Sequence, residues 1–189
     1  MIKAIIFDCF GVLVSDGWLP FKRKYFGDTP ALMEETTRLN HLVDAGALPY
    51  KDFIHSIAQL AHINTDEAHT QIENNPSNMP LFEYIQSELA PHYTLGILSN
   101  AAENWLDELF TAEQLGIFTD YVLSFQIGVI KPQPEAYQAI ATKLGVALDE
   151  CIFIDDQPAY CEGAGAVGMK AIHYTDIESL KTQLARYLS

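Results

Sequence analysis

The stretch IIFDCFGVLV, residues 5–14, places an aspartate at the end of an apolar run and a phenylalanine two positions later. The run before Asp8 has the length and composition of a buried β-strand. A charged side chain at the end of such a strand needs a reason, because burying an unpaired carboxylate is costly. We therefore predict a first strand whose carboxyl end faces a functional site. Phe10 stands where a second polar group could have assisted Asp8.

Short apolar stretches alternate with helix-like segments through the second half of the chain. The strand-like stretches, counting the first, are residues 2–7, 93–98, 120–124, 151–154 and 169–173. The helix-like segments are roughly 101–111, 133–145, 157–166 and 176–188. Strands that alternate with helices are typical of βαβ units. The pattern predicts an α/β fold with a parallel sheet covered by helices on both faces.

Between the first two strands, residues 15–90 show almost no strand signal. Pro30 and Gly46 bracket one helix-like segment, Pro49 opens a second, and Asn64 precedes a third. Residues 80–90 are expected to form a helix that returns to the sheet.

This pattern predicts an all-helical insert after the first strand. We expect residues 1–14 and 81–189 to form the core domain and residues 15–80 to form a helical cap subdomain.

The composition is that of a globular protein with a strong negative charge. The net charge of −14 repels nucleic acids and anionic membrane surfaces. No apolar run approaches the roughly 20 residues of a membrane-spanning helix, and the N-terminal run lacks the features of a signal peptide. Cys9, Cys151 and Cys161 have no metal-like CxxC spacing, so free thiols are expected. These features predict a cytoplasmic protein that binds neither nucleic acid nor membrane.

Polar residues follow four of the predicted strands. In α/β sheets the reactive site lies at the carboxyl ends of the strands, so these residues should converge. They are Asp8, the pair Ser99 and Asn100, Lys131, and the pair Asp155 and Asp156.

This set suggests phosphoryl transfer through an aspartate. A carboxylate such as Asp8 can attack phosphorus once the charge of the phosphate is neutralised. Asp8 and one of the two later aspartates could hold Mg²⁺, which prefers oxygen ligands. Ser99 and the amides after it could bind phosphate oxygens at a helix start, and Lys131 would supply a positive charge. Taken singly, each residue also has an ordinary structural explanation, as a helix cap, a turn or a solvated lysine.

The motifs together resemble the haloacid dehalogenase superfamily, whose members are mostly Mg²⁺-dependent phosphatases. They are hhFDxxGV at 5–12, ILSN at 97–100, GxxKPxPEAY at 128–137, and FIDD followed by GA at 163–164. The resemblance implies a Rossmann-like core with a helical cap inserted after the first motif.

By the same resemblance, each candidate residue has a role. Asp8 would be the nucleophile, and Ser99, Asn100 and Lys131 would bind phosphate. Asp156 would be a metal ligand, and Asp155 would support Lys131 or the metal from outside the ligand set.

Two residues depart from the superfamily pattern. Phosphatases of this kind carry a second aspartate, which transfers protons, where this chain has Phe10. The backbone carbonyl of Phe10 can still serve as a Mg²⁺ ligand. Tyr160 stands where an Asp or Asn often follows the acidic pair, which predicts a weaker metal site. A phosphatase that is slow, or selective for good leaving groups, is therefore expected to act on a small phosphorylated metabolite.

Two alternatives stay open. An aromatic residue at position 10 also resembles the dehalogenase branch of the superfamily, which carries a tyrosine there and attacks carbon without a metal. This chain differs from that branch at Val12 and at residues 155–157, although Arg38 and Tyr137 can be aligned with it loosely. Alternatively, the chain is a degenerate member that binds a phosphorylated ligand or a partner without turnover.

The predicted cap carries the only hints of specificity. WLPFKRKYF, residues 18–26, sets Lys22, Arg23 and Lys24 among aromatic side chains. These bases either receive an anionic or sugar-like substrate or form a solvated face over packed aromatics. His41 and His55 are expected to be surface or packing residues. The pattern names neither the substrate nor the oligomeric state.

Overall fold

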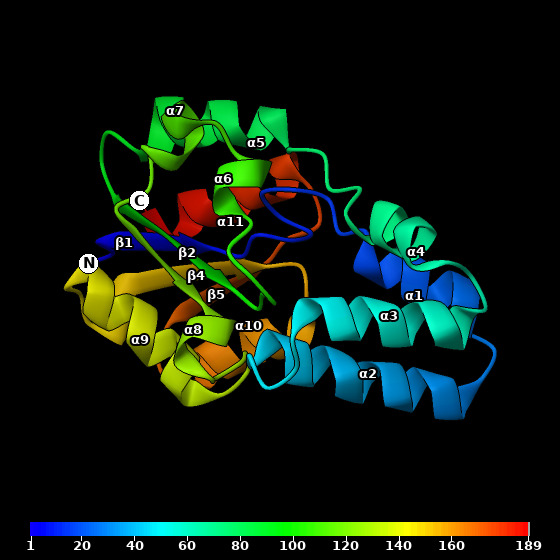
Figure 1. Ribbon diagram of the computed structural model, residues 1–189. Coiled ribbons are helices and arrows are strands. Elements are labelled where there is room, and N and C mark those ends of the chain that lie inside the picture. The colour runs from blue at the N-terminus through cyan, green and yellow to red at the C-terminus, as the bar shows by residue number, and fades with distance from the viewer. Residues whose placement is uncertain (189) are drawn as a thin grey trace.

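The first strand lies at the centre of a five-stranded parallel sheet (Figure 1), with the strand order β3-β2-β1-β4-β5. This is the computed structural model of the chain, and it describes residues 1–188. The strands are β1 (Ala4–Phe7), β2 (Thr94–Ser99), β3 (Asp120–Leu123), β4 (Cys151–Asp155) and β5 (Lys170–His173). The predicted α/β fold, Rossmann-like with helices on both faces, is confirmed.

Helices cover the two faces of the sheet, and alternate residues of β1 point to each face. Ile5 and Phe7 join the hydrophobic cluster under α5 and α11, and Ala4 and Ile6 join the cluster under α9 and α10. The helices of the core are α5 (Met79–Tyr84), continuing as η1 (Ile85–Leu89), α6 (Leu106–Leu109), α7 (Ala112–Leu115), α8 (Ser124–Ile127), α9 (Pro134–Leu144), the short η2 (Leu148–Glu150), α10 (Pro158–Ala166) and α11 (Ile177–Leu188).

One predicted helix of the core is wrong. Residues 101–105 are irregular, and the helix expected over 101–111 is replaced by the short helices α6 and α7. The Asn104 side chain forms a turn with the backbone two residues on, which competes with a helix through this segment, and a tertiary contact holds Ala101. The Ala101 N–H donates to Ser124 Oγ at 2.9 Å, and the Asn104 side chain accepts from the Leu106 N–H at 3.3 Å. The helices predicted near 133–145, 157–166 and 176–188 are confirmed as α9, α10 and α11.

Four helices follow β1 and lie together beyond the carboxyl ends of the strands (Figure 1). They are α1 (Trp18–Phe26), α2 (Pro30–Asp44), α3 (Tyr50–Ala61) and α4 (Thr65–Ile72), called here the four-helix insert. They enclose a hydrophobic cluster of their own, separate from those against the sheet. The helix α1 was not anticipated from the sequence. The division at residues 15 and 80 stays a prediction.

The two connections between the core and the four-helix insert run side by side. Val14 and Ser77 form an antiparallel bridge, and the Ser15 N–H donates to the Pro76 carbonyl at 2.9 Å. The Asn78 side chain donates to the Val12 carbonyl at 2.9 Å. These bonds fix the insert close to the turn that follows Asp8.

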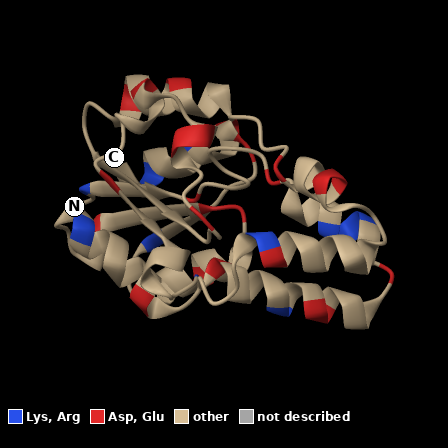
Figure 2. Ribbon diagram, in the orientation of Figure 1, with Lys and Arg blue, Asp and Glu red and all other residues tan. Residues whose placement is uncertain are grey.

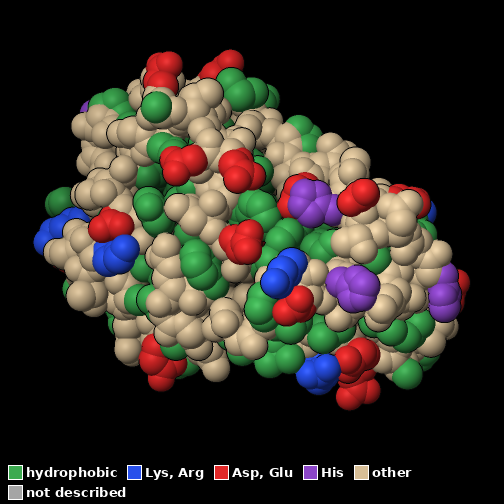
Figure 3. All heavy atoms as spheres, viewed as in Figure 1, with side chains coloured by type: hydrophobic (Ala, Val, Ile, Leu, Met, Phe, Trp, Pro, Cys, Tyr) green, Lys and Arg blue, Asp and Glu red, His purple; other side chains and the backbone are tan. Residues whose placement is uncertain are grey.

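Charge and hydrophobicity are spread over the molecule. Figure 2 shows acidic positions on both the core and the four-helix insert, and the face drawn in Figure 3 has no continuous basic patch. Among residues 1–188, no helix combines the length and the hydrophobicity that crossing a bilayer requires. Cys9 and Cys151 are buried free thiols as expected, and Cys161 is a partly buried one. The cytoplasmic location stays a prediction.

Candidate active site

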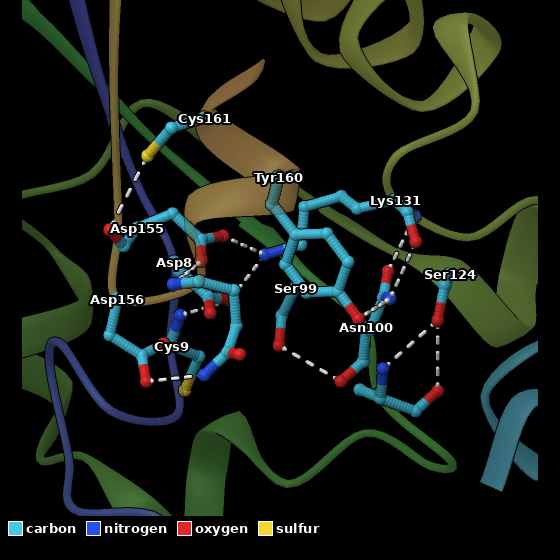
Figure 4. A network of polar contacts seen from close by, with 12 residues as sticks. Asp8, Cys9, Ser99, Asn100, Ser124, Lys131, Asp155, Asp156, Tyr160 and Cys161 are labelled. Carbon is cyan, nitrogen blue, oxygen red and sulfur yellow. Dashed lines mark hydrogen bonds and ion pairs between the residues drawn. The ribbon is translucent and has the colours of Figure 1, made fainter. Parts of the chain in front are cut away.

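The carboxyl ends of three strands bring Asp8, Lys131, Asp155 and Asp156 into one polar network (Figure 4). Asp8 follows β1 directly, and its backbone N–H donates to the Ile154 carbonyl of β4 at 2.8 Å. Asp155 is the last residue of β4, and Asp156 comes next. Lys131 enters from the loop between α8 and α9. The sequence expectation that these four side chains converge is therefore met by the fold.

Lys131 is buried and bridges two carboxylates. Its Nζ lies 2.8 Å from Asp8 Oδ1 and 2.6 Å from Asp155 Oδ2. The rings of Phe153 and Tyr160 lie 5.2 and 5.0 Å from the same nitrogen. Burial opposes the charged form, but the two carboxylates outweigh it and raise the pKa of Lys131. The lysine is thus a permanent cation at the centre of the network.

Asp8 has one oxygen engaged and one free. Oδ1 accepts a hydrogen bond from the Cys9 N–H at 2.7 Å as well as the ion pair with Lys131. Oδ2 accepts no hydrogen bond from any described residue. Burial and the nearby Asp155 raise the pKa of Asp8 well above its ordinary value, and Lys131 offsets this only in part.

Asp155 and Asp156 have different surroundings. Asp155 uses both oxygens, one toward Lys131 and the other to accept from the Gln157 N–H at 2.8 Å. In Asp156, Oδ2 accepts from Gln157 Nε2 at 2.7 Å, and Oδ1 is left without a partner among the described residues. Burial and Asp155 raise the pKa of Asp156. Both oxygens of Asp155 are therefore engaged by protein groups, whereas Asp156 has one oxygen available to bind a ligand.

The acidic cluster fits a divalent cation. Asp8, Asp155 and Asp156 each offer an oxygen within 4.8 Å of the others. Three carboxylates facing one ammonium carry an excess of negative charge, which the raised pKa values of Asp8 and Asp156 reflect. The free oxygen of Asp156 and the Phe10 carbonyl, which accepts no hydrogen bond from residues 1–188, are hard donors of the kind that Mg²⁺ prefers, and Asp8 adds a carboxylate beside them.

Gly11 allows the chain to turn close to this cluster. Its φ of +86° lies in the left-handed region, and a Cβ at this position would lie 2.5 Å from the Asp156 carboxyl carbon. Only glycine satisfies both conditions without displacing Asp156.

Ser99 and Asn100 differ from the expectation that they precede a helix. Ser99 ends β2, is almost fully buried, and does not line the cavity described below. The Asn100 side chain holds the backbone of Lys131: its Oδ1 accepts from the Lys131 N–H at 2.8 Å, and its Nδ2 donates to the Lys131 carbonyl at 3.2 Å. Their predicted contacts with phosphate stay predictions, but the helix start expected there is wrong because α6 begins at Leu106.

Tyr160 and Gln157 complete the surroundings of the acidic pair. The ring of Tyr160 lies against the Lys131 ammonium, and its hydroxyl lies 3.4 Å from Asn100 Nδ2. Gln157, whose role the sequence did not reveal, holds Asp156 through its side chain. The expected weakening of the metal site by Tyr160 stays a prediction.

A cavity of about 510 Å³ separates this cluster from the four-helix insert. Asp8, Phe10, Asp156 and Tyr160 line its core side. Lys131 does not line the cavity. Asp8 therefore lies between Lys131 and the cavity.

The insert side of the cavity carries polar groups that the sequence did not single out. They include Asp16, which precedes α1, and Asp44, which ends α2. Aromatic rings of α1 and α3 line the same side, and Trp105, in the loop before α6, lines the core side. Lys22 is buried and its Nζ lies 2.5 Å from Thr37 Oγ1, whereas Arg23 and Lys24 are exposed. The three predicted bases therefore split into one cavity residue and two surface residues. Single acids in an amphipathic helix carry no sequence signal, because the packing of the insert on the core decides their burial.

The two predicted histidines are exposed. His41 reaches the rim of the cavity, and His55 contacts the Gln59 side chain at 2.9 Å. Arg38, which aligned loosely with the dehalogenase branch, pairs with Glu35 on the surface.

A family model described as haloacid dehalogenase-like hydrolase matches residues 2–168. The chain belongs to this family. The match spans the strands β1 to β4, the four-helix insert and all of the residues in the acidic cluster, and it ends before β5.

Relatives of this hydrolase include proteins of two activities. The chain is 31% identical to "Phosphatase MT3486" of Mycobacterium tuberculosis, over 90% of this chain and 86% of that protein. The fold is similar to a HAD family enzyme of Bacteroides thetaiotaomicron in complex with magnesium and inorganic phosphate, with a TM-score of 0.72 and 20% identity over 95% of this chain and 99% of that one.

The fold is also similar to L-2-haloacid dehalogenase of Xanthobacter autotrophicus, with a TM-score of 0.66 and 20% identity over 98% and 83% of the two chains. At these identities the solved structures bear on the fold alone, so the choice between the two activities depends on the site itself.

Proposed function

We propose that this hydrolase is a Mg²⁺-dependent phosphatase that acts on a small phosphorylated metabolite through an aspartyl-phosphate at Asp8. The observation that carries the proposal is the arrangement around Lys131. The lysine engages one oxygen of Asp8 and one of Asp155, while the second oxygen of Asp8 and one oxygen of Asp156 have no partner among residues 1–188. A site with two free carboxylate oxygens and an excess of negative charge suits a divalent cation and a phosphate better than an organic halide.

The chain itself would carry out the first step as follows. Lys131 and the Cys9 N–H hold Asp8 Oδ1, so Oδ2 is the oxygen that attacks phosphorus. A bond forms between Oδ2 and phosphorus, and the bond from phosphorus to the leaving oxygen breaks with its electron pair. Phosphate would bind beside Asp8, and Ser99, Asn100 and Lys131 are the residues proposed to hold it.

In the second step, a water attacks the phosphorus of the aspartyl-phosphate. The bond to Oδ2 breaks, its electron pair returns to Asp8, the water keeps one proton as a phosphate hydroxyl and gives up the other, and inorganic phosphate leaves. Asp8, Asp156 and the Phe10 carbonyl would hold Mg²⁺, with Asp155 behind them. The bound cation would supply the positive charge that keeps Asp8 ionised and neutralises the phosphate oxygens.

Phe10 limits the range of substrates. General acid–base catalysis contributes typically about 10²–10⁴ in rate, and a phenyl ring cannot transfer a proton. Aryl and acyl phosphates, whose leaving groups need little protonation, should therefore be hydrolysed faster than alkyl phosphates.

The test is phosphate release from p-nitrophenyl phosphate and acetyl phosphate with Mg²⁺. We expect release by the wild type and none by Asp8→Asn, a variant of nearly equal size that cannot attack phosphorus. Silence across a phosphate panel with Mg²⁺ binding intact would instead indicate a binding protein without turnover. Chloride release from a 2-haloacid without metal would indicate a dehalogenase.

A further inference from the structure

Asp44 is a buried carboxylic acid of the four-helix insert, and it lines the same cavity as Asp8 and Asp156. It is the last residue of α2 and is 8% exposed. Its Oδ2 accepts a hydrogen bond from Asn40 Nδ2 at 2.7 Å, and no Lys, Arg or His among residues 1–188 forms an ion pair with it. The two reaction steps proposed for the acidic cluster assign no role to Asp44.

Its surroundings make the charged form unfavourable. Burial disfavours a carboxylate, and the C-terminal end of a helix adds a partial negative charge of its own. A residue that costs stability in two ways, with no cation beside it, calls for a functional explanation. One oxygen of the Asp44 carboxyl, Oδ1, also lacks a hydrogen-bond partner among residues 1–188. Every fully buried side-chain nitrogen or oxygen of residues 1–188 has a hydrogen-bond partner, yet Asp44 Oδ1 has none, so this oxygen keeps some accessible surface, and Asp44 lines the cavity.

Hydrogen bonds tie Asp44 to the strand ends. Ser124, the first residue after β3, donates from Oγ to the Asp44 carbonyl at 2.5 Å. The same Oγ accepts from the Ala101 N–H at 2.9 Å, and Ala101 follows Asn100 (Figure 4). Two residues on, Gly46 packs so tightly that a Cβ would lie 2.8 Å from the Phe125 carbonyl oxygen. The end of α2 is thus held against the carboxyl edge of the sheet.

We propose that Asp44 transfers the protons that Phe10 cannot, as acid to the leaving group and as base to the attacking water. This inference rests on the proposed phosphatase function. In an in-line displacement the leaving oxygen departs on the side of phosphorus opposite Asp8, and the water later attacks from that same side. A single carboxyl on the insert side of the cavity can therefore serve both steps.

The proton transfers balance. In the first step the Asp44 carboxyl gives its proton to the leaving oxygen as the bond to phosphorus breaks, and the leaving group departs as an alcohol. In the second step the Asp44 carboxylate takes a proton from the attacking water, and Asp8 recovers its electron pair. Both residues then return to their starting forms.

The acidity of Asp44 suits this use. Burial raises its pKa to about 7, while the charge of Lys131 and the hydrogen bond from Asn40 lower it and Asp16 raises it. The other titratable groups in the cavity lining are Tyr160, His41, Lys22, Tyr50, Glu73, Glu108, Asp8 and Asp156. An acid–base group performs best when its pKa lies near the working pH.

Asp16 is the competing candidate, because it also lines the cavity. Its Oδ1 accepts from the Trp18 N–H at 2.8 Å, at the start of α1. This bond stabilises the carboxylate and gives Asp16 a structural task that Asp44 lacks.

The experiment compares Asp44→Asn with wild type on a series of phosphate monoesters whose leaving alcohols differ in pKa. We expect turnover of alkyl phosphates to fall by about 10²-fold, and turnover of p-nitrophenyl phosphate to change by no more than about threefold. In the wild type, alkyl turnover should decline as the pH rises through about 7, where Asp44 loses its proton, and Asp44→Asn should lack that decline. The melting temperature should not fall, since a buried unpaired charge is removed.

Asp16→Asn and the exposed Glu34→Gln of the same helix α2 serve as controls for the loss of one acid. Three results would overturn the assignment to Asp44. They are an equal loss of turnover on all substrates in Asp44→Asn, no loss of turnover in that variant, or a loss in Asp16→Asn that depends on the leaving group. A wild type that hydrolyses no phosphate ester, or an Asp8→Asn variant that still does, would overturn the proposed function and this inference with it.

Discussion

Phe10 is a cavity residue whose side chain is only partly buried, so the position can accept a polar group. We expect Phe10→Asp to raise the turnover of alkyl phosphates by about tenfold or more, because a carboxyl beside the nucleophile adds a second proton donor. Turnover of aryl phosphates should change little. Steady-state kinetics on both substrate types measures the difference.

Phe10→Asn is the matched control, since it has the same size and polarity but cannot transfer a proton. An unchanged rate on alkyl phosphates in a folded, Mg²⁺-binding Phe10→Asp variant would contradict the view that proton transfer to the leaving group limits the turnover of alkyl phosphates.

Lys131 balances two buried carboxylates, and removing it should leave both without a cationic partner. We expect Lys131→Met to lower the free energy of unfolding by about 3–5 kcal/mol at pH 7. Urea denaturation measures it. Lys143→Met is the control, because Lys143 pairs with Asp120 on the surface, where such pairs contribute about 0–1 kcal/mol.

The loss in Lys131→Met should depend on pH in a defined direction. Burial and Asp155 already raise the pKa of Asp8, and losing the ammonium raises it further. The folded variant then holds protons that the unfolded chain releases above about pH 4, so its stability falls as the pH rises. The difference from wild type should shrink toward pH 4, and a difference independent of pH would contradict this electrostatic role.

At the scale of elements, the turn after β1 places Gly11 against Asp156. We expect Gly11→Ala to cost about 1–3 kcal/mol of unfolding free energy through its positive φ, and to abolish most of the phosphate release by displacing Asp156. Gly145→Ala is the matched control. Gly145 has a φ of +68°, but a Cβ added there would meet no atom within 4 Å.

Both glycine variants should therefore lose stability, and only Gly11→Ala should lose activity. Equal activity in the two variants would show that the close contact with Asp156 does not matter.

The elements themselves could be predicted largely from periodicity and turn residues. The strands and the helices α9, α10 and α11 follow from apolar runs that each element carries within its own sequence. The segment 101–105 could not be predicted, since its path depends on a contact with Ser124, a residue distant in sequence, whose Oγ accepts from the Ala101 N–H. The helix α1 was missed because its pattern mixes aromatic and basic residues around Pro20.

At the scale of the whole molecule, the parallel sheet explains why the site was foreseeable in part. Strand ends must meet at one edge, so Asp8, Lys131, Asp155 and Asp156 could be grouped from the sequence alone. Asp44 could not, because its burial depends on how the four-helix insert packs against the strand ends. The cavity between these two parts holds the groups that would decide which phosphate ester is used.

The most direct test of the proposed reaction is mass spectrometry of the protein quenched in acid during turnover of acetyl phosphate with Mg²⁺. We predict one phosphoryl group on the peptide that contains Asp8, removed by hydroxylamine as an acyl phosphate should be, and absent from Asp8→Asn. Phosphate release that continues in Asp8→Asn, or a phosphoryl group found on another residue, would contradict the assignment of Asp8 as the nucleophile.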